Sequence, residues 1–322
     1  MARPDDAMKS ILLFRLGGLG DLFVALPSIQ LAKRRYRGSS LCLVCRTEYG
    51  RLLEETGVVD VIIPAEDRRW LPLFDDRPDV PDDLRKWLEK FHFILGWFQG
   101  EEHRPFERKV FAPTAAGGQL IVYEPRSGIP VSRYFFDRTS ALIGRPHARD
   151  TFEACHKLPS LKERDRHKSL VRKSGPPMGR GRFAVVHPGS GSPKKCWPLE
   201  NFLTLIGRLY RKGIKGFLIT GEAEERMERT ILDSGLPSGW SWLHRTPLIR
   251  LAGLLEGADV YIGNDSGVTH LAAACGTQGL AIFRNDLESA WKPYGRIHVM
   301  SAADVAAITV ESVVEKIEGN LL

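Results

Sequence analysis

Residues 260–275 read VYIGNDSGVTHLAAAC, which is an apolar run, a short polar turn and an alanine-rich segment. Residues 260–263 are typical of the end of a buried strand, and residues 267–275 have the small apolar face of a tightly packed helix. Alternating strands and helices of this kind build α/β folds. The stretch therefore predicts an α/β fold and places a polar turn at the end of one of its strands.

The turn Asn264-Asp265-Ser266-Gly267 predicts an anion site. A helix that begins at Ser266 or Gly267 leaves its first backbone N–H groups without acceptors inside the helix. Those groups and the helix dipole favour a bound phosphate by roughly 0.3–1 kcal/mol at an exposed site and up to about 2 kcal/mol when partly buried. Gly267 permits a close approach of the ligand. The alternative is that Asp265 or Ser266 only caps the helix.

The size and composition of the chain are those of an ordinary soluble globular protein. Its 322 residues suffice for about two domains with cores of their own. Hydrophobic residues make up 43% of the chain and charged residues 26%, which is normal for such a protein. No apolar run approaches the roughly eighteen residues of a membrane span, and residues 1–10 lead into a strand without the core of a signal peptide. We therefore expect a cytoplasmic protein.

The formal net charge of +7 indicates an anionic partner. A nucleotide sugar, the cytoplasmic face of an anionic membrane and nucleic acid would each suit a basic protein. Nucleic acid is the least favoured of the three, because the chain has no recognition-helix, RNA-motif or zinc-finger spacing.

Five scattered cysteines indicate reduced thiols and argue against a disulfide framework. Cys42 and Cys45 form a Cys-x-x-Cys pair inside the strand-like LCLVC. Positions three apart on a strand point to opposite faces. Core packing is therefore favoured over metal or redox chemistry at this pair.

The first half opens with a strand, a glycine-rich turn and a helix. Residues 11–16, ILLFRL, form the short apolar run of a strand covered on both faces, and residues 22–36 have helical periodicity. The turn between them is no dinucleotide-binding fingerprint, since GxGxxG from Gly18 would need glycine where Phe23 stands. It also lacks the Lys-Ser/Thr ending of a P-loop. These absences disfavour a nicotinamide enzyme and a P-loop hydrolase.

Strand and helix patterns alternate along both halves, which predicts two Rossmann-like domains, each with a parallel, doubly wound sheet. In the first half we expect strands at 41–45, 60–64 and 92–98 and helices near 49–55 and 82–91. In the second half we expect strands at 183–187, 216–220, 260–262 and 280–283 and helices at 199–211, 222–232, 247–255 and 310–317. Residues 99–130 have little pattern and are expected to be loop.

Residues 162–182 are basic, rich in glycine and proline and without apolar periodicity, which indicates a linker. We expect an N-terminal domain over 1–165, a linker over 166–182 and a C-terminal domain over 183–322. The charge of this segment is interpreted as solvated surface, with contact to anionic lipid as the alternative. The carboxyl ends of two such sheets are expected to face a shared cleft.

Three segments resemble the ADP-heptose:lipopolysaccharide heptosyltransferases, a glycosyltransferase family of the two-domain GT-B type. They are residues 15–30 (RLGGLGDLFVALPSIQ), 187–198 (HPGSGSPKKCWP) and 263–277 (GNDSGVTHLAAACGT). Their order and spacing cover most of the chain. The resemblance implies an inverting transferase with no cofactor, in which the N-terminal domain binds the acceptor and the C-terminal domain binds the nucleotide sugar.

By this resemblance Asp21 corresponds to the general base that deprotonates the acceptor hydroxyl, and Gly18 and Gly20 lie on the acceptor side of the same turn. Such a base typically contributes about 10²–10⁴ in rate. The alternative is that Asp21 caps its helix, and the two roles can coexist. Lys195 corresponds to the family's Lys-x-Trp-Pro lysine, which neutralises the departing diphosphate. Because a metal ion often has this task and the chain has no DxD motif, we expect a metal-independent enzyme.

The resemblance also implies a set of donor-binding residues. Asp265 would hold sugar hydroxyls, while Ser266 and Gly267 would donate backbone N–H groups to the diphosphate. His270 matches a family histidine near that site, with a structural role equally open. The remaining candidates are Ser190 and Gly191 for phosphate, and Glu222 or Glu224 for the ribose hydroxyls.

The chain departs from the family pattern after Phe283. Members usually continue Gly-Pro-Thr-Asp-Pro, whereas residues 284–288 read RNDLE, so that Arg284 could contact phosphate and the donor sugar stays open. We expect heptose transfer from ADP-heptose to a lipopolysaccharide inner-core acceptor, an anionic glycolipid, with peripheral contact to the inner membrane. The alternatives are a transferase or epimerase for another nucleotide sugar, or a catalytically silent nucleotide-sugar-binding protein of envelope assembly.

Overall fold

The computed structural model describes residues 10–75, 79–100, 103–111, 117–123, 128–144, 149–161 and 182–320. Contacts between residues divide the chain into two compact units, Met1–His156 and Lys157–Leu322. Residues 157–161 belong to the second unit, where the backbone N–H of Leu158 donates to the carbonyl of Ala274 at 2.8 Å. The expected linker over 166–182 lies outside the described residues except for Arg182.

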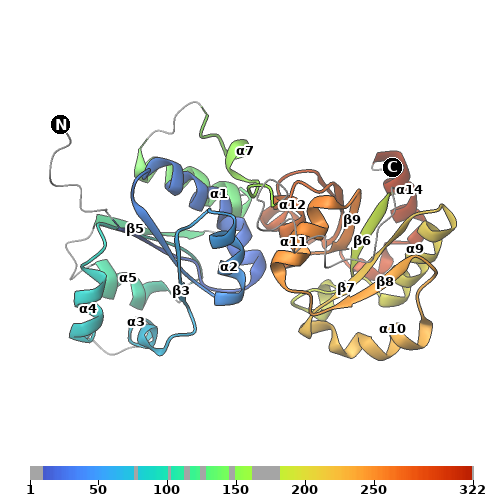
Figure 1. Cartoon of the computed structure of the whole chain (residues 1–322), viewed down its shortest axis with the longest axis horizontal. Coiled ribbons are helices and arrows are strands. Elements are labelled where there is room, and N and C mark those ends of the chain that lie inside the picture. Colours follow the sequence, from blue (N-terminus) through green and yellow to red (C-terminus); the bar gives the residue numbers. More distant parts are fainter. Residues whose placement is uncertain are drawn as a thin grey trace. The chain divides into compact units, whose positions relative to one another are not determined.

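A five-stranded parallel sheet forms the centre of the first unit (Figure 1). Its strands are β1 (Ser10–Phe14), β2 (Ser40–Cys45), β3 (Val61–Pro64), β4 (Phe93–Gln99) and β5 (Gly117–Tyr123). They lie in the order β3-β2-β1-β4-β5. The strand order thus reverses between β1 and β4, and in open α/β sheets this switch point is where ligands bind.

Helices cover both faces of this sheet. They are α1 (Leu19–Arg35), α2 (Thr47–Glu55), α3 (Leu71–Phe74), α4 (Asp82–Leu88), α5 (His103–Phe111), α6 (Val131–Ile143) and α7 (Phe152–Cys155). On one face, Phe14 of β1 lies edge-on to Phe106 of α5 with ring centroids 4.8 Å apart. On the other, the indole N–H of Trp97 donates to Thr139 of α6 at 2.9 Å. Double coverage explains the continuous apolar runs of β1 and β2.

The expectation of loop over residues 99–130 is wrong for two elements, α5 and β5. β5 pairs with β4 over its whole length, but it is an edge strand whose first three residues are exposed. An edge strand buries only part of its length, so its apolar pattern is weak. In α5 the two buried apolar positions, Phe106 and Val110, are separated by three charged residues, one of which, Lys109, is itself buried.

A six-stranded parallel sheet forms the second unit. Its strands are β6 (Phe183–His187), β7 (Lys215–Thr220), β8 (Trp240–His244), β9 (Val260–Asn264), β10 (Gly279–Arg284) and β11 (Ile297–Ala302). The order is β11-β10-β9-β6-β7-β8, which is the Rossmann order with its switch point between β6 and β9. The two strands that sequence patterning missed, β8 and β11, are both at the edges and only partly buried.

The helices of the second unit are α9 (Leu199–Arg211), α10 (Glu228–Ser234), α11 (Leu248–Gly257), α12 (Gly267–Ala274), α13 (Asn285–Trp291) and α14 (Val310–Asn320). Phe202 of α9 and Val313 of α14 share one core cluster with Val186 and Ile262 of the sheet. On the opposite face the Tyr261 hydroxyl lies 2.9 Å from the Thr269 hydroxyl of α12. The expected helix over 222–232 begins instead as a 3-10 helix, Glu222–Met227, before α10.

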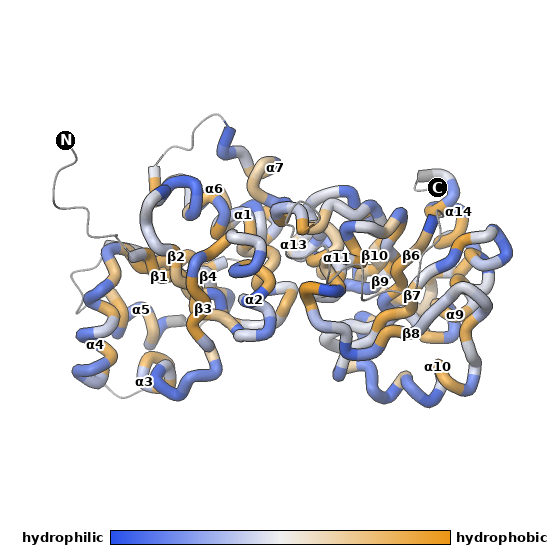
Figure 2. Tube along the Cα trace, in the orientation of Figure 1, coloured by the Kyte–Doolittle hydropathy of each residue, from blue (hydrophilic) through white to orange (hydrophobic). Residues whose placement is uncertain are grey.

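Hydrophobic residues follow the strands of each sheet, and hydrophilic residues follow the outer turns of the helices (Figure 2). Cys42 and Cys45 are both buried and unbridged on opposite faces of β2, and burial raises the pKa of the Cys45 thiol to about 12. Their Cys-x-x-Cys spacing therefore belongs to core packing. Within the described residues, no helix combines the length and the apolar character that crossing a bilayer requires.

Candidate active site

Two loops leave the carboxyl ends of β6 and β9, the neighbouring strands at the switch point of the second sheet. Asn264 joins them. Its side-chain N–H donates to the Pro188 carbonyl at 2.8 Å, and its side-chain oxygen accepts from the backbone N–H of Trp197 at 3.0 Å. The Ser190 hydroxyl adds a third link by donating to the Asp265 carbonyl at 2.6 Å. The three contacts are buried, so the two loops form one rigid surface.

A short ion pair joins the same two loops. The Lys195 ammonium lies 2.7 Å from Oδ2 of Asp265. The Asp265 side chain is 7% exposed and that of Lys195 31%, so the carboxylate is fixed in the protein while the cation reaches solvent. The neighbouring Lys194 is exposed. The sequence singled out Lys195 and Asp265 separately, and the fold brings them together.

Helix α12 begins beside this pair. The Ser266 hydroxyl accepts from the Thr269 N–H at 3.4 Å, so Ser266 caps the helix, which is the role that the alternative interpretation gave to Asp265 or Ser266. Within the described part of the chain, the backbone N–H groups of Gly267 and Val268 have no acceptor. The same turn therefore holds a helix cap and two unpaired backbone N–H groups. These N–H groups carry partial positive charge and directly follow the segment Asp265–Ser266, of which Asp265 is the partner of Lys195.

Behind the Ser266 cap lies a buried polar chain that sequence reasoning missed. Nδ1 of His187, at the end of β6, is 3.2 Å from the Ser266 hydroxyl, and its Nε2 is 3.8 Å from the Glu224 carboxylate. Glu224 also accepts from the Gly221 N–H at 2.7 Å. The sequence had given Glu224 as a candidate for the ribose hydroxyls and His187 as the first residue of a motif, but it had not predicted their contact.

The environment of Glu224 favours its charged form. Burial by itself would raise the pKa of this carboxyl, but the His187 hydrogen bond and charge, the Gly221 N–H and Arg226 together lower it below the usual value for glutamate. The fit is close, because a Cβ added at Gly189 would lie 2.0 Å from Oε1 of Glu224. Any larger residue at 189 would therefore force the Glu224 carboxylate to move.

The other expected donor residues are spread around this core. Glu222 is exposed at the start of the 3-10 helix, whereas Glu224 is buried in the His187 chain. Gly191 is exposed and has open space around it. His270 is buried in the first turn of α12. Arg284 pairs with Asp286 at 3.0 Å, and the segment after Phe283 forms helix α13.

Asp21 lies at the switch point of the first sheet, in the first turn of α1. Its Oδ2 accepts from the Gly18 N–H at 2.8 Å, and its Oδ1 accepts from Arg15 at 2.9 Å and from Gln99 at 3.5 Å. The Gly18 contact caps the helix, which is the alternative role given to Asp21 and one that can coexist with catalysis. The carboxylate is 33% exposed, so one side of it stays open to a ligand. Gly20 follows in the helix.

Arg15 anchors this carboxylate. Its guanidinium is buried, donates to the Trp97 carbonyl at 2.9 Å and lies 5.4 Å from the centre of the Phe135 ring. Burial lowers the pKa of Arg15 from 12.5 to about 10, and the charge of Asp21 opposes that shift. Gly17 has a φ of +111°, and a Cβ there would lie 2.6 Å from Oδ2 of Asp21, so the turn needs glycine.

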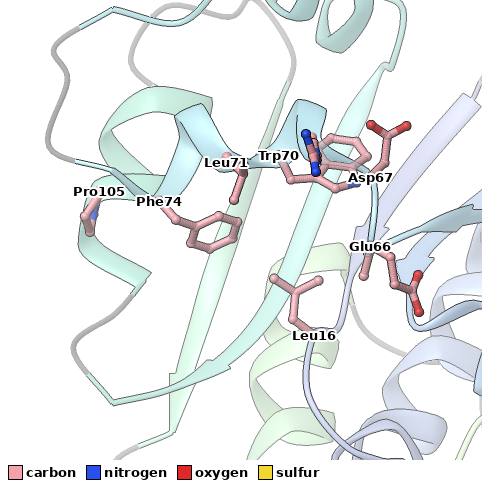
Figure 3. Close-up of a pocket in the computed structure, with 9 residues that line it drawn as sticks. Leu16, Glu66, Asp67, Trp70, Leu71, Phe74 and Pro105 are labelled. Carbon is pink, nitrogen blue, oxygen red and sulfur yellow. The ribbon is translucent and has the colours of Figure 1, made fainter.

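A hollow of about 750 Å³ opens in the first unit near the end of β1 (Figure 3). It is lined mainly by apolar side chains, with three charged residues among them. The lining residues are Leu16, Ala65, Glu66, Asp67, Arg68, Trp70, Leu71, Phe74 and Pro105. Leu16 lies two residues after the end of β1, which puts the hollow at the carboxyl edge of the sheet, the edge of the Asp21 turn. Sequence patterning gave no sign of it.

Residues 126–315 match glycosyltransferase family 9 (heptosyltransferase). The chain belongs to this family. It is therefore a glycosyltransferase, as the resemblance of its three motifs implied. Among curated members, lipopolysaccharide heptosyltransferase 1 of Escherichia coli K12 is 22% identical over 302 residues, which cover 85% of this chain and 87% of that protein. The core heptosyltransferase OpsX of Haemophilus influenzae is 23% identical over 310 residues, covering 91% and 84%.

Solved structures of the heptosyltransferase family share the fold. ADP-heptose lipopolysaccharide heptosyltransferase II of E. coli superposes with a TM-score of 0.74 at 17% identity over 97% of this chain and 98% of that one. E. coli heptosyltransferase WaaC, solved with ADP, gives a TM-score of 0.69 at 19% identity over 97% and 99%. The predicted fold class, two Rossmann-like α/β domains of the GT-B type, is confirmed.

Proposed function

We propose that this family 9 member is an inverting, metal-independent heptosyltransferase that moves heptose from ADP-heptose to a lipopolysaccharide inner-core acceptor. The proposal of a nucleotide-sugar donor depends on one observation. The Lys195 ammonium pairs with Asp265, directly before the unpaired N–H groups in the first turn of α12. A cation and a helix N-terminus at a sheet switch point suit a diphosphate. The names of the curated relatives support the acceptor, and a family structure solved with ADP supports the nucleotide.

The proposed reaction is a single displacement. Asp21 takes the proton of the acceptor hydroxyl while that oxygen bonds to the anomeric carbon of the heptose. The bond from that carbon to the diphosphate oxygen breaks, and the electron pair leaves with ADP. Lys195 and the N–H groups of Gly267 and Val268 stabilise the negative charge that develops there. Attack opposite to the leaving group inverts the anomeric configuration.

The acceptor side of the proposal rests on the Asp21 turn. Arg15 and Gly18 hold the carboxylate with its remaining side exposed, which suits a base that has to meet an incoming hydroxyl. A lipopolysaccharide core precursor carries negative charge, which complements the net charge of +7. Contact with the cytoplasmic face of the inner membrane stays a prediction that follows from such an acceptor.

A second candidate keeps the reaction class but changes the donor sugar. Helix α13, with the Arg284–Asp286 pair at its start, occupies the place where family members carry a tight turn near the donor. A changed element beside the donor favours a changed sugar. The nucleotide would then differ together with the sugar, as in a transferase for another nucleotide sugar.

Calorimetry and a transfer assay test these possibilities. The proposal predicts that ADP binds far better than UDP or GDP, and that ADP-heptose with an inner-core acceptor gives a product one heptose heavier by mass spectrometry, with inverted anomeric configuration by NMR. EDTA should leave the rate unchanged. Preference for UDP or GDP would favour the second candidate, and nucleotide binding without turnover of any donor would indicate a silent binding protein.

A further inference from the structure

The contact between Lys195 and Asp265 sets up a competition for one ammonium group. The structure pairs the ammonium with Oδ2 of Asp265 at 2.7 Å. The proposed function asks the same ammonium to neutralise a diphosphate at the N-terminus of α12. If the Lys195 ammonium moves to the phosphate, it loses its contact with Asp265. If it stays with Asp265, it neutralises the phosphate only weakly.

The two partners differ in how far they can move. Asp265 is held at its backbone, where its N–H donates to the Ile282 carbonyl at 2.9 Å and its carbonyl accepts from the buried Ser190 hydroxyl at 2.6 Å. Lys195 ends the short 3-10 turn Pro193–Lys195, and its long side chain is 31% exposed. The cation can therefore swing toward a ligand, while the carboxylate has to stay in place.

A buried carboxylate that loses its cation is strongly destabilised unless other donors replace the cation. ADP brings only phosphate oxygens to this place, and these are acceptors. A sugar on the diphosphate brings hydroxyl groups, which can donate to Asp265 once Lys195 has left. The two ligands thus differ in whether they can satisfy Asp265 after the exchange.

We propose that Lys195 exchanges Asp265 for the diphosphate when the donor binds, and that Asp265 thereby makes the site selective for the nucleotide sugar over the free nucleoside diphosphate. The inference rests on the proposed function and deepens it. After transfer the sugar hydroxyls depart with the product, Asp265 draws Lys195 back, and the nucleoside diphosphate is held less tightly. Asp265 is in this view a specificity-determining residue that acts through Lys195.

Calorimetry with ADP and with ADP-heptose, in the absence of acceptor, tests the exchange in the full chain. Asp265→Asn frees Lys195 for phosphate, so ADP should bind roughly five- to tenfold more tightly than to the wild type, while ADP-heptose binds no better. Glu318→Gln is the matched control, because it removes an equal charge from an exposed ion pair in the same unit, the one between Lys212 and Glu318. An ADP affinity of Asp265→Asn no higher than that of this control overturns the proposal.

A double-mutant cycle separates exchange from simple repulsion between Asp265 and the diphosphate. Exchange requires Lys195, so in a Lys195→Gln background the Asp265→Asn substitution should raise ADP affinity much less than in the wild type. Repulsion does not require Lys195, and an equal or larger gain in that background overturns the proposal.

Two further measurements keep the result unambiguous. If Asp265→Asn lacks the cooperative thermal unfolding of the wild type, Asp265→Ser takes its place in the cycle and is expected to give the same gain in ADP affinity. A wild-type protein that binds neither ADP nor ADP-heptose contradicts the proposed function, and with it this inference. A wild type that binds both, with no gain on substitution of Asp265, overturns only the inference.

Discussion

Arg15 holds Asp21 by two contacts, one from Nη2 to the carboxylate at 2.9 Å and one from Nε to the backbone carbonyl at 2.7 Å. Arg15 is itself buried and tied to Trp97, so it fixes both the position and the rotation of the aspartate. The Gly18 N–H donates a hydrogen bond to the second oxygen of the Asp21 carboxylate. A side chain held this firmly at the start of a helix is suited to meet a substrate without first having to be ordered.

Asp21→Asn should lower turnover by about 10²–10⁴ and leave donor binding nearly intact. The amide keeps an oxygen for the Gly18 N–H but cannot take a proton. Steady-state kinetics with ADP-heptose and calorimetry with ADP give the two quantities. Turnover close to that of the wild type would remove Asp21 from the chemistry and leave it as a helix cap.

Lys195→Met should reduce turnover by about 10²–10³ and weaken ADP binding, because the departing diphosphate loses its cation. Lys194→Met is the matched control, since it changes the neighbouring exposed residue of the same turn and removes the same charge. Its rate should stay within about twofold of the wild type. Equal losses in the two variants would mean that general positive charge, and not the placement of Lys195, is what matters.

Gly189→Ala should destabilise the protein by about 1–3 kcal/mol, because the new methyl group would lie 2.0 Å from Oε1 of Glu224 and push the carboxylate away from His187. Gly191→Ala is the companion variant in the same loop, and it places its methyl group in open space. Urea unfolding of both measures the difference. A Gly189→Ala variant as stable as Gly191→Ala would show that Glu224 relaxes freely.

Glu224→Gln should cost about 1–3 kcal/mol of unfolding free energy at pH 7 and progressively less in acid. The folded environment lowers the pKa of Glu224, so the unfolded chain binds the proton more readily and the stabilisation is present above the usual pKa of glutamate. As the pH falls through the lowered pKa, this stabilisation is lost in the wild type. Urea midpoints between pH 7 and pH 3 should therefore converge, and a gap that widens in acid would contradict the assignment.

The buried strands and the polar turns that follow them were predictable from local patterns. β1, β2, β6 and β9 are covered on both faces, so each appears as an apolar run that ends in glycine or a polar residue. The strands β5, β8 and β11 escaped prediction because they are partly exposed edge strands that mix polar residues or glycine with apolar ones. The edge strand β3 was predicted because its residues VIIP form a continuous apolar run.

Residue types and spacing were enough to predict an α/β chain of two Rossmann-like halves, a helix start at Ser266 or Gly267 with Asp265 or Ser266 as its possible cap, and the family to which the motifs belong. Those features depend on a few consecutive residues, whose conformational preferences and side-chain chemistry act locally. The contacts that build the site join distant segments. Lys195 meets Asp265, His187 lies between Ser266 and Glu224, and Arg15 reaches Trp97 only because the strand order of each sheet places the loops side by side. Pairings across a parallel sheet arise from packing over long sequence separations, and no local pattern encodes them.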